Sequence, residues 1–249
     1  MAKQTGIFNF EGTLDNVTFY KTEDGLLVRK KSGVNKQRIK NDAAFVRTRE
    51  NCAEFANCAK CASTFRQTAA IMVNRARDSK LSSRIIKVFF AIKKLDTVNL
   101  RGERSVGQGL TTAAGKTLLK NFDFNRHSNL HSVLAAPYVL NPATSTITFD
   151  ALNPLEALNF PEGATHFGLQ NAVMHIDLIG GTSEIGYSEV LNYPISNSIV
   201  TPVLTPSTIP TASGTKIYLL LITFYQEVNG LQYVLHNGTF NALSVIEVL

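Results

Sequence analysis

Basic residues are nearly absent from the second half of this 249-residue chain. Of the 25 lysines and arginines, 24 lie at or before Arg126, and only Lys216 follows. Residues 1–126 carry 24 basic and 11 acidic side chains, a net charge of +13, whereas residues 127–249 carry 1 basic and 8 acidic side chains, a net charge of −7. This asymmetry predicts an acidic partner for the basic half, either a nucleic acid or another copy of the chain that docks head to tail.

Long apolar runs are also missing. The sequence starts with MAKQTGIFNFEG, which has no apolar stretch of signal-peptide length, and runs such as residues 217–225 are too short to cross a bilayer. We therefore expect synthesis as a soluble cytoplasmic protein without membrane insertion, and the final location, whether cytoplasmic, virion-like or extracellular, stays open. The three cysteines are odd in number and close together, which is typical of reduced thiols rather than of a secreted disulfide framework.

Motifs for catalysis are lacking too. The serine-nucleophile pattern G-x-S-x-G is absent, and no pair of carboxylates stands out. Residues 109–117 approach a phosphate-binding loop, but five residues instead of four separate Gly109 from Gly115, and no predicted strand precedes them. We interpret this segment as a loop followed by a helix start, and we expect a protein that is not an enzyme.

Metal ligands are poorly arranged. Cys52, Cys58 and Cys61 have no histidine upstream of His127 to complete a site, so we interpret them as small buried residues. His127 and His131 are four residues apart but lack the glutamate of the usual zinc hydrolase motif, which favours a polar connector. The sequence therefore predicts no cofactor, no metal and no small-molecule substrate.

The N-terminal half has the pattern of a small β-ribbon followed by helices. Short strands are predicted over residues 6–10, 17–21 and 26–29, with a turn at residues 22–25 where Asp24-Gly25 suits a tight hairpin. Asn41 or Asp42 then offers an N-cap for a helix that begins at residue 43. Further helices are predicted over residues 64–76 and 79–95. Because an isolated ribbon is marginal in water, it must pack on these helices or on a neighbouring subunit.

After Pro142 the hydrophobic period changes toward two, which is typical of strands. Asn229-Gly230 is the strongest hairpin signal in the chain. The fold class predicted is α+β, with an N-terminal β-ribbon plus helices and a C-terminal antiparallel β-sandwich or barrel-like domain. We expect a basic domain over residues 1–126, a connector over 127–143 and an acidic β domain over 144–249. The predicted strands cover residues 144–149, 165–178, 186–191, 216–228, 232–236 and 240–249.

The clustered basic residues near the ribbon are the candidate contact site. Clusters of this kind bind phosphates, and Phe19, Tyr20 and Phe45 offer stacking, although Asp42, Glu50 and Glu54 partly neutralise the charge. The basic candidates are Arg29, Lys30, Lys31, Lys36, Arg38, Lys40, Arg47 and Arg49. An acidic partner face on the other half is predicted at Glu156, Glu162, Glu184 and Glu189.

The N-terminal motif resembles that of a family of uncharacterised proteins from Bacteroidota-type bacteria. The resemblance implies an ordered N-terminal motif but no activity, and it supplies no catalytic or binding residues. Ordered termini are easiest to explain if neighbouring subunits hold them, for example by strand exchange through the ribbon or residues 244–249. The residues that carry the resemblance are MAKQTGI at positions 1–7, Gly12-Thr13, TFYK at 18–21, Asp24-Gly25, Val28-Arg29, Gly33-Val34, Arg38-Ile39, RTREN at 47–51, Arg101-Gly102 and FYQEVNG at 224–230.

The sequence thus leads to two functional hypotheses. The first is a non-enzymatic structural protein that self-assembles head to tail into a filament, tube or shell. The alternative is a nonspecific nucleic-acid-associated protein, such as a phage-like coat protein whose basic half faces the genome. The partners expected are therefore copies of the chain itself and nucleic acid.

Overall fold

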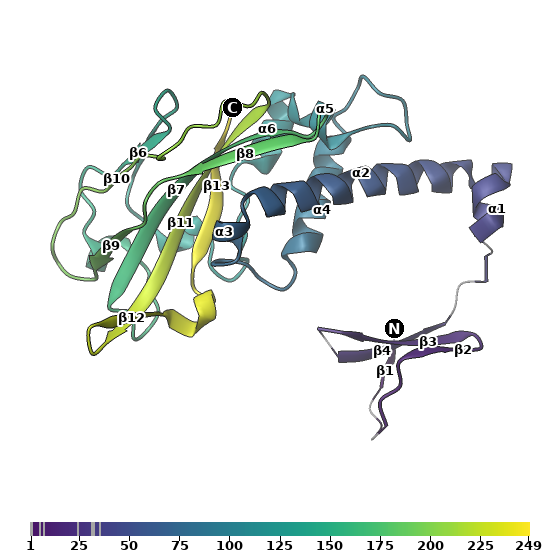
Figure 1. The fold of residues 1–249 in the computed structure, drawn as a ribbon, viewed down its shortest axis with the longest axis horizontal. Coiled ribbons are helices and arrows are strands. Elements are labelled where there is room, and N and C mark those ends of the chain that lie inside the picture. Colours follow the sequence, from purple (N-terminus) through teal and green to yellow (C-terminus); the bar gives the residue numbers. More distant parts are fainter. Residues whose placement is uncertain (1, 5, 7, 24, 31–32, 35) are drawn as a thin grey trace. The chain divides into compact units, whose positions relative to one another are not determined.

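The computed structural model describes residues 2–4, 6, 8–23, 25–30, 33–34 and 36–249. These residues form two compact units, residues 1–52 and residues 53–249, and each unit is described by itself. The ribbon in Figure 1 shows the elements of both.

The larger unit is built around two long antiparallel strands, β7 and β11. They pair from Thr215 opposite Ile176 to Tyr225 opposite His166. Shorter strands complete a six-stranded antiparallel sheet, with β8 and β9 beside β7 and with β12 and β13 beside β11. The six strands are β7 (His166–Asp177), β8 (Thr182–Tyr187), β9 (Leu191–Pro194), β11 (Thr215–Val228), β12 (Leu231–Val234) and β13 (Ala242–Val248).

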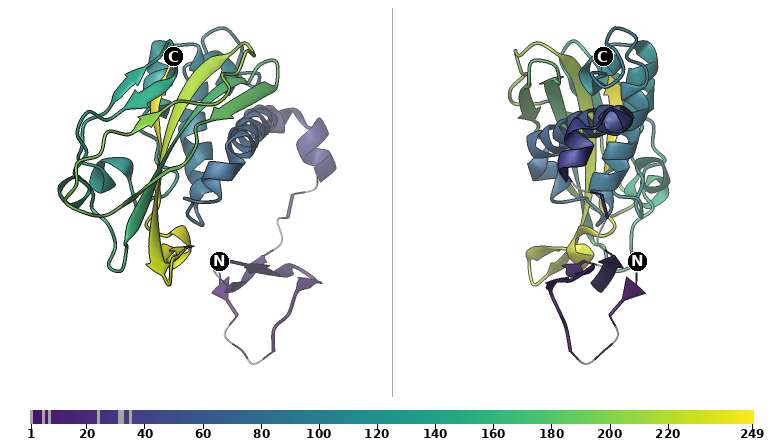
Figure 2. Two further views of the ribbon diagram at one scale, coloured as in Figure 1. Left: turned by 60° about the vertical axis from the view of Figure 1, so that its left-hand side comes forward. Right: turned by 90° about the vertical axis from the view of Figure 1, so that its right-hand side faces the viewer.

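Both faces of this sheet are buried, because alternate side chains of a strand point to opposite faces. On β7, Met174 and Ile176 belong to one hydrophobic core, whereas Leu169 and Val173 belong to the other. A layer of helices covers the first core, and a layer of short strands and helical turns covers the second (Figures 1 and 2).

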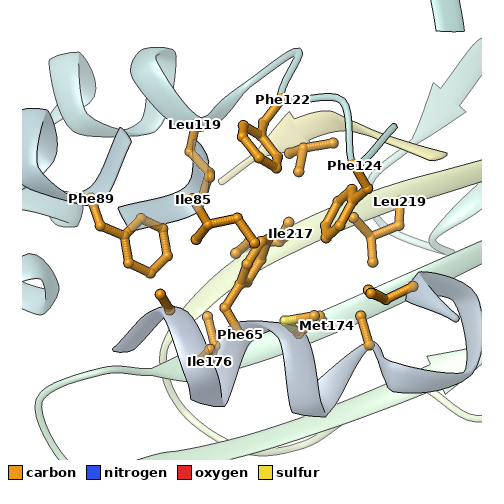
Figure 3. Close-up of a cluster of buried hydrophobic side chains, with 14 of the residues drawn as sticks. Phe65, Ile85, Phe89, Leu119, Phe122, Phe124, Met174, Ile176, Ile217 and Leu219 are labelled. Carbon is orange, nitrogen blue, oxygen red and sulfur yellow. The ribbon is translucent and has the colours of Figure 1, made fainter. Parts of the chain in front are cut away.

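The helix layer packs on the sheet through a cluster of phenylalanines. The ring of Phe65 lies 5.8 Å from that of Phe89 and 5.6 Å from that of Phe124, and all three are fully buried. Figure 3 shows these rings among Met174, Ile217 and other side chains of the sheet. The helices are α2 (Val46–Thr68), α3 (Ala70–Val73), α4 (Leu81–Lys93), α5 (Val106–Leu110) and α6 (Ala113–Leu119).

The layer on the other face closes the second core with Leu130, Val133, Ile147, Leu158 and Leu204. Side-chain N-caps start its short helices, since Asn129 accepts from the amide of Ser132 and Asn153 from that of Leu155. Its elements are α7 (Leu130–Val133), β5 (Val139–Asn141), β6 (Thr146–Thr148), α8 (Pro154–Ala157) and β10 (Val203–Leu204).

The smaller unit contains a four-stranded antiparallel sheet in the order β1-β4-β3-β2, followed by α1 and η1. Asp42 accepts from the amide of Ala44 at 2.9 Å and so caps η1, as the sequence predicted for this position. The strands and helices are β1 (Ala2–Lys3), β2 (Gly12–Leu14), β3 (Val17–Thr22), β4 (Gly25–Lys30), α1 (Lys36–Asn41) and η1 (Ala43–Phe45).

The α+β class, the curled antiparallel C-terminal sheet and the strands predicted at residues 17–21 and 26–29 are confirmed. The strand predicted at residues 6–10 was wrong, because its described residues form no strand and lie between β1 and β2. The Asn229-Gly230 hairpin is confirmed as well: Val228 pairs with Leu231, and φ is +52° at Asn229 and +77° at Gly230, as a tight two-residue turn requires. The predicted turn at residues 22–25 pairs Thr22 with Gly25, and its Asp24 lies outside the described residues.

The compact units do not divide where the sequence predicted. The division falls between Cys52 and Ala53, inside α2, and not at residue 126. The reason is the shared core: helices from the basic half and strands from the acidic half bury their apolar side chains against each other. Residues 127–143, expected to form a polar connector, contribute the buried Leu130 and Val133 to the second core.

Phe65→Ala is expected to lower the free energy of unfolding by about 3–5 kcal/mol, because it removes a fully buried ring from a packed core. Phe55→Ala on the same helix is the matched control; its side chain is 51% exposed, so a loss of about 1 kcal/mol or less is expected. Urea unfolding followed by circular dichroism measures both. Helices that unfold at a lower urea concentration than the sheet would contradict the shared core.

Candidate assembly interface

The sheet of the smaller unit has one apolar and one polar face. Strand pairing places Phe19 opposite Val28 and Val17 opposite Lys30, so these residues share a face. The opposite face carries mainly polar side chains, among them Thr18 and Arg29. We call the first one the apolar face; it consists of Ala2, Leu14, Val17, Phe19, Leu26 and Val28, with Lys21 and Lys30 beside them.

The described residues of the smaller unit cover this apolar face only in part. None of the described residues between 2 and 52 is fully buried: Val17, Phe19, Leu26 and Val28 are partly buried, and Leu14 is 69% exposed. The ring of Phe10, which is 58% exposed, lies 5.9 Å from that of Phe19. A hollow of about 530 Å³ lies on this part of the sheet, lined in part by Val17 and Val28. The sheet therefore has the side-chain pattern of a packed layer, and the described residues of its unit cover that layer only in part.

The predicted basic residues fall on three elements of the smaller unit, and three of them bind other residues of the same unit. Arg38 pairs with Asp42 at 3.1 Å, and Arg47 pairs with Glu50 at 3.0 Å. Arg49 donates to the backbone carbonyls of Ile39 and Asp42, each at 2.9 Å, and so holds the end of α1 against the start of α2. These three arginines contribute to the fold of the unit.

The other basic candidates are more available. Lys30, Lys36 and Lys40 are exposed and have no carboxylate partner among the residues that the structure describes. The guanidinium of Arg29 lies 5.4 Å from the ring centre of Tyr20, on the polar face. Lys31 lies outside the described residues.

The four predicted acidic residues are exposed but come from different elements. Glu156 lies in α8, Glu162 precedes β7, Glu184 lies in β8 and Glu189 follows β8. The carboxylate of Glu184 accepts from the amides of Thr211 and Ala212 at 3.2 and 3.3 Å, so it anchors the loop that crosses β8.

Charge is divided between layers rather than between domains. Residues 53–126, which supply the helix layer, carry 14 basic and 5 acidic side chains, a net charge of +9. Residues 127–249, which supply the sheet and the layer on its other face, have the net charge of −7 noted above. One compact unit therefore carries both signs, with the basic excess on the helix layer.

A second exposed apolar surface lies on the larger unit, at the hairpin of β11 and β12, which lies at the lower end of the sheet in Figure 1. Val228 is 47% exposed, Leu231 61%, Tyr233 56% and Val234 53%. The sequence predicts the hairpin but not its exposure, because alternation of apolar residues usually signals a buried face. The one sequence feature that could have indicated this exposure is that β12 has apolar side chains on both of its sides.

Buried charges lie elsewhere in the larger unit, around Glu54. Its carboxylate binds the ammonium of Lys93, the guanidinium of Arg104 at 2.9 Å and the amide of Gly102 at 2.9 Å. Burial by itself raises the pKa of Glu54, but these hydrogen bonds outweigh it and bring the pKa from 4.5 to about 2. Glu54 therefore stays ionised at neutral pH and holds the loop after α4 to α2.

Asp96 belongs to the same loop and stabilises it. Burial tends to raise its pKa, yet hydrogen bonds from the side chain and amide of Asn99 and from the amides of Ser105 and Val98 bring it to about 2. All of these donors belong to the loop that follows α4. The two carboxylates thus act as structural anchors.

The near match to a phosphate-binding loop has a packing explanation. A side chain at Gly109 would place its Cβ 2.1 Å from the carbonyl oxygen of Ile92, and one at Gly115 would lie 2.1 Å from that of Gly109. The glycines therefore allow α4, α5 and α6 to approach closely. Thr112 caps α6 by accepting from the amide of Gly115 at 3.0 Å. The predicted helix start is found at Ala113, but Gly109 and Leu110 belong to α5, so the predicted loop is only the short link between α5 and α6.

Cys58 and Cys61 are buried, as predicted, and burial raises the pKa of each thiol to about 11. The expectation was wrong for Cys52, which is exposed in the first third of α2. His127 accepts from Arg126 at 3.0 Å, and His131 lies on the short α7. Within the described part of the chain, no three His, Cys, Asp or Glu residues are grouped so that they could hold a metal ion.

Comparisons with protein families, with curated proteins and with solved structures find no match for this chain. Among the described helices, none combines the length and the apolar character needed to span a bilayer.

Glu54→Gln is expected to lower the free energy of unfolding at pH 7 by about 3 kcal/mol or more, because it leaves the ammonium of Lys93 buried without its counter-charge. Since the pKa of Glu54 is lower in the folded protein, its contribution is present above pH 4.5 and is lost as the pH falls toward 2. The variant should therefore show a shallower loss of stability over that range. Urea titrations at several pH values measure both effects.

Glu103→Gln is the control for this variant, because Glu103 is exposed in the same loop. A change within about 0.5 kcal/mol is expected for it. Equal effects of the two substitutions would contradict the anchoring role of Glu54.

Proposed function

We propose that this chain is a non-enzymatic structural protein whose copies assemble head to tail into a filament, tube or shell, with the N-terminal sheet as one of the contacting surfaces. The observation that carries the proposal is the apolar face of that sheet, where Val17, Phe19 and Val28 lie side by side and are only partly buried by the described residues. A β-sheet becomes stable in water when a hydrophobic face packs against another element.

The edges of the sheet support the same conclusion. Its outer strands are short, with two residues in β1 and three in β2. Short edge strands limit uncontrolled edge-to-edge pairing. A surface that is apolar on its face and restricted at its edges suits one specific packing partner.

The charge distribution supports a head-to-tail arrangement. A basic helix layer and an acidic sheet side on one unit attract each other between copies, but each repels its own kind. A contact between two different surfaces repeats along a chain of copies and forms an open filament, or a closed ring when the rotation closes. Exposed charges more than about 10 Å apart are screened at 0.1 M salt, so assembly should depend on ionic strength.

The purified full-length protein is expected to form large assemblies at about 50 mM salt and high concentration, and smaller species at about 500 mM salt. Light scattering over a concentration series measures this change, and negative-stain microscopy shows the geometry. A protein that stays monomeric at low salt and high concentration would contradict the proposal.

The same samples test the nucleic-acid alternative. Exposed Lys30, Lys36 and Lys40 are suited to phosphate contacts, and bound nucleic acid would raise the absorbance at 260 nm relative to that at 280 nm in a salt-dependent way. Assembly that persists after nuclease treatment and without excess absorbance at 260 nm supports self-assembly. Assembly that disappears after nuclease treatment favours the alternative and contradicts the proposal.

A further inference from the structure

A groove on the helix layer combines apolar side chains with basic ones. It has a volume of about 400 Å³ and lies along α4, beside the end of α6. Leu118, which is 45% exposed, leaves apolar surface in this groove open to a partner. We call it the α4–α6 groove; it is lined by Arg84, Lys87, Val88, Ala91, Leu118 and Phe122.

The charge around this groove is positive. Residues 79–95 and 104–122, which include α4, α5 and α6, have eight basic side chains and no acidic one. Arg84 is held inside the unit, because its guanidinium binds Asp78 and lies 5.2 Å from the ring centre of Phe122. Lys87 is exposed and has no carboxylate partner among the residues that the structure describes. The groove therefore favours an occupant that has an apolar side chain next to a carboxylate.

The acidic side of the same unit contains carboxylates that are free to meet such a groove. Residues 127–249 have eight acidic side chains, and four of them bind other groups of the chain, namely Asp177, Glu184, Glu227 and Glu247. The other four are exposed and have no side-chain partner among the described residues; they are Asp150, Glu156, Glu162 and Glu189.

Of these four, Glu156 has a large exposed apolar side chain beside it. Leu155, its neighbour in α8, is 48% exposed, whereas the residues that flank the other three are small, partly buried or buried. Pro154 at the start of α8 and Leu158 just after it are buried, so Leu155 and Glu156 lie on the outer side of this helical turn. The turn thus presents the apolar side chain and the carboxylate together.

Charge also selects between the possible pairs of surfaces. Two α4–α6 grooves packed together would bring Lys87 against Lys87, and two α8 turns would bring Glu156 against Glu156. Like charges in such positions oppose association, whereas a groove against an α8 turn brings opposite charges together.

We propose that Leu155 of one copy enters the α4–α6 groove of the next copy, with Glu156 beside the ammonium of Lys87. The contact rests on the proposed self-assembly and names two of its surfaces, both on the larger unit. Because the groove and the α8 turn are different surfaces of one compact unit, the contact repeats from copy to copy in one direction.

Charge reversal on either side of the contact tests it in the full-length protein. The groove variant is Lys87→Glu, and the α8 variants are Glu156→Lys and Leu155→Asp. The matched controls are Lys60→Glu, on an exposed lysine of α2, and Glu189→Lys, on an exposed glutamate outside α8. A further chain combines Lys87→Glu with Glu156→Lys. Circular dichroism and thermal unfolding check that all variants are folded.

Each of the three single variants is expected to raise the concentration at which copies associate at least about tenfold, because it places like charges or a buried carboxylate in the contact. The chain with both charges reversed should associate within about threefold of the unaltered protein, since the pair is restored with exchanged signs. The controls should also stay within about threefold. Sedimentation velocity over a concentration series measures these values.

The possible failures are distinguishable. If the unaltered protein is monomeric, the proposed function fails, and this contact fails with it. If the unaltered protein assembles and the single variants assemble equally well, self-assembly stands but this contact is wrong. If Lys87→Glu weakens association and the α8 variants do not, the groove receives a different segment or a different protein, and the proposal is contradicted. If both charge variants weaken association but their combination does not restore it, the two residues do not face each other and the contact is wrong.

Discussion

A β-sheet in water needs a second layer over its apolar face, and this requirement is met in one part of the chain and only partly met in another. The central sheet is covered on both faces, with Phe65, Phe89 and Phe124 on one side and Leu130 and Ile147 on the other. The N-terminal sheet has the same alternation of side chains, but the described residues of its own unit bury its apolar face only in part. The proposed assembly would supply the second layer that such a sheet needs.

The same requirement explains how the charge is arranged. Apolar side chains of the basic half must face the sheet, so its lysines and arginines are left on the outer surface of the helix layer. Lys93 is the exception, because it is buried against Glu54, which also binds Arg104 and holds a loop in place. The boundary at Arg126 thus separates the helix layer of the larger unit, which has a basic excess, from the rest of that unit, which has an acidic excess.

Periodicity and turn chemistry predicted most of the fold. Asn229-Gly230 located a hairpin, Asp42 located a cap, and the strands β7, β11 and β13 were found within a few residues. The domain boundary was not predictable in this way, because periodicity shows that a face is apolar but not which partner covers it. For the same reason, residues 244–249 were a candidate for strand exchange, whereas the structure pairs them within β13 between β11 and residues 121–124. The candidate site was only partly predictable, since Arg49 has the sequence context of a surface cation but binds two carbonyls of its own unit.

Hydrogen–deuterium exchange of the full-length protein at several concentrations tests the central claim most directly. The account predicts that amides of β3 and β4 exchange rapidly in dilute solution and slowly at concentrations where copies associate. Amides of β7 and β11, which are covered within the chain, should be protected at every concentration. Protection of β3 and β4 that is the same in dilute and concentrated solution would contradict the claim that another copy covers the N-terminal sheet.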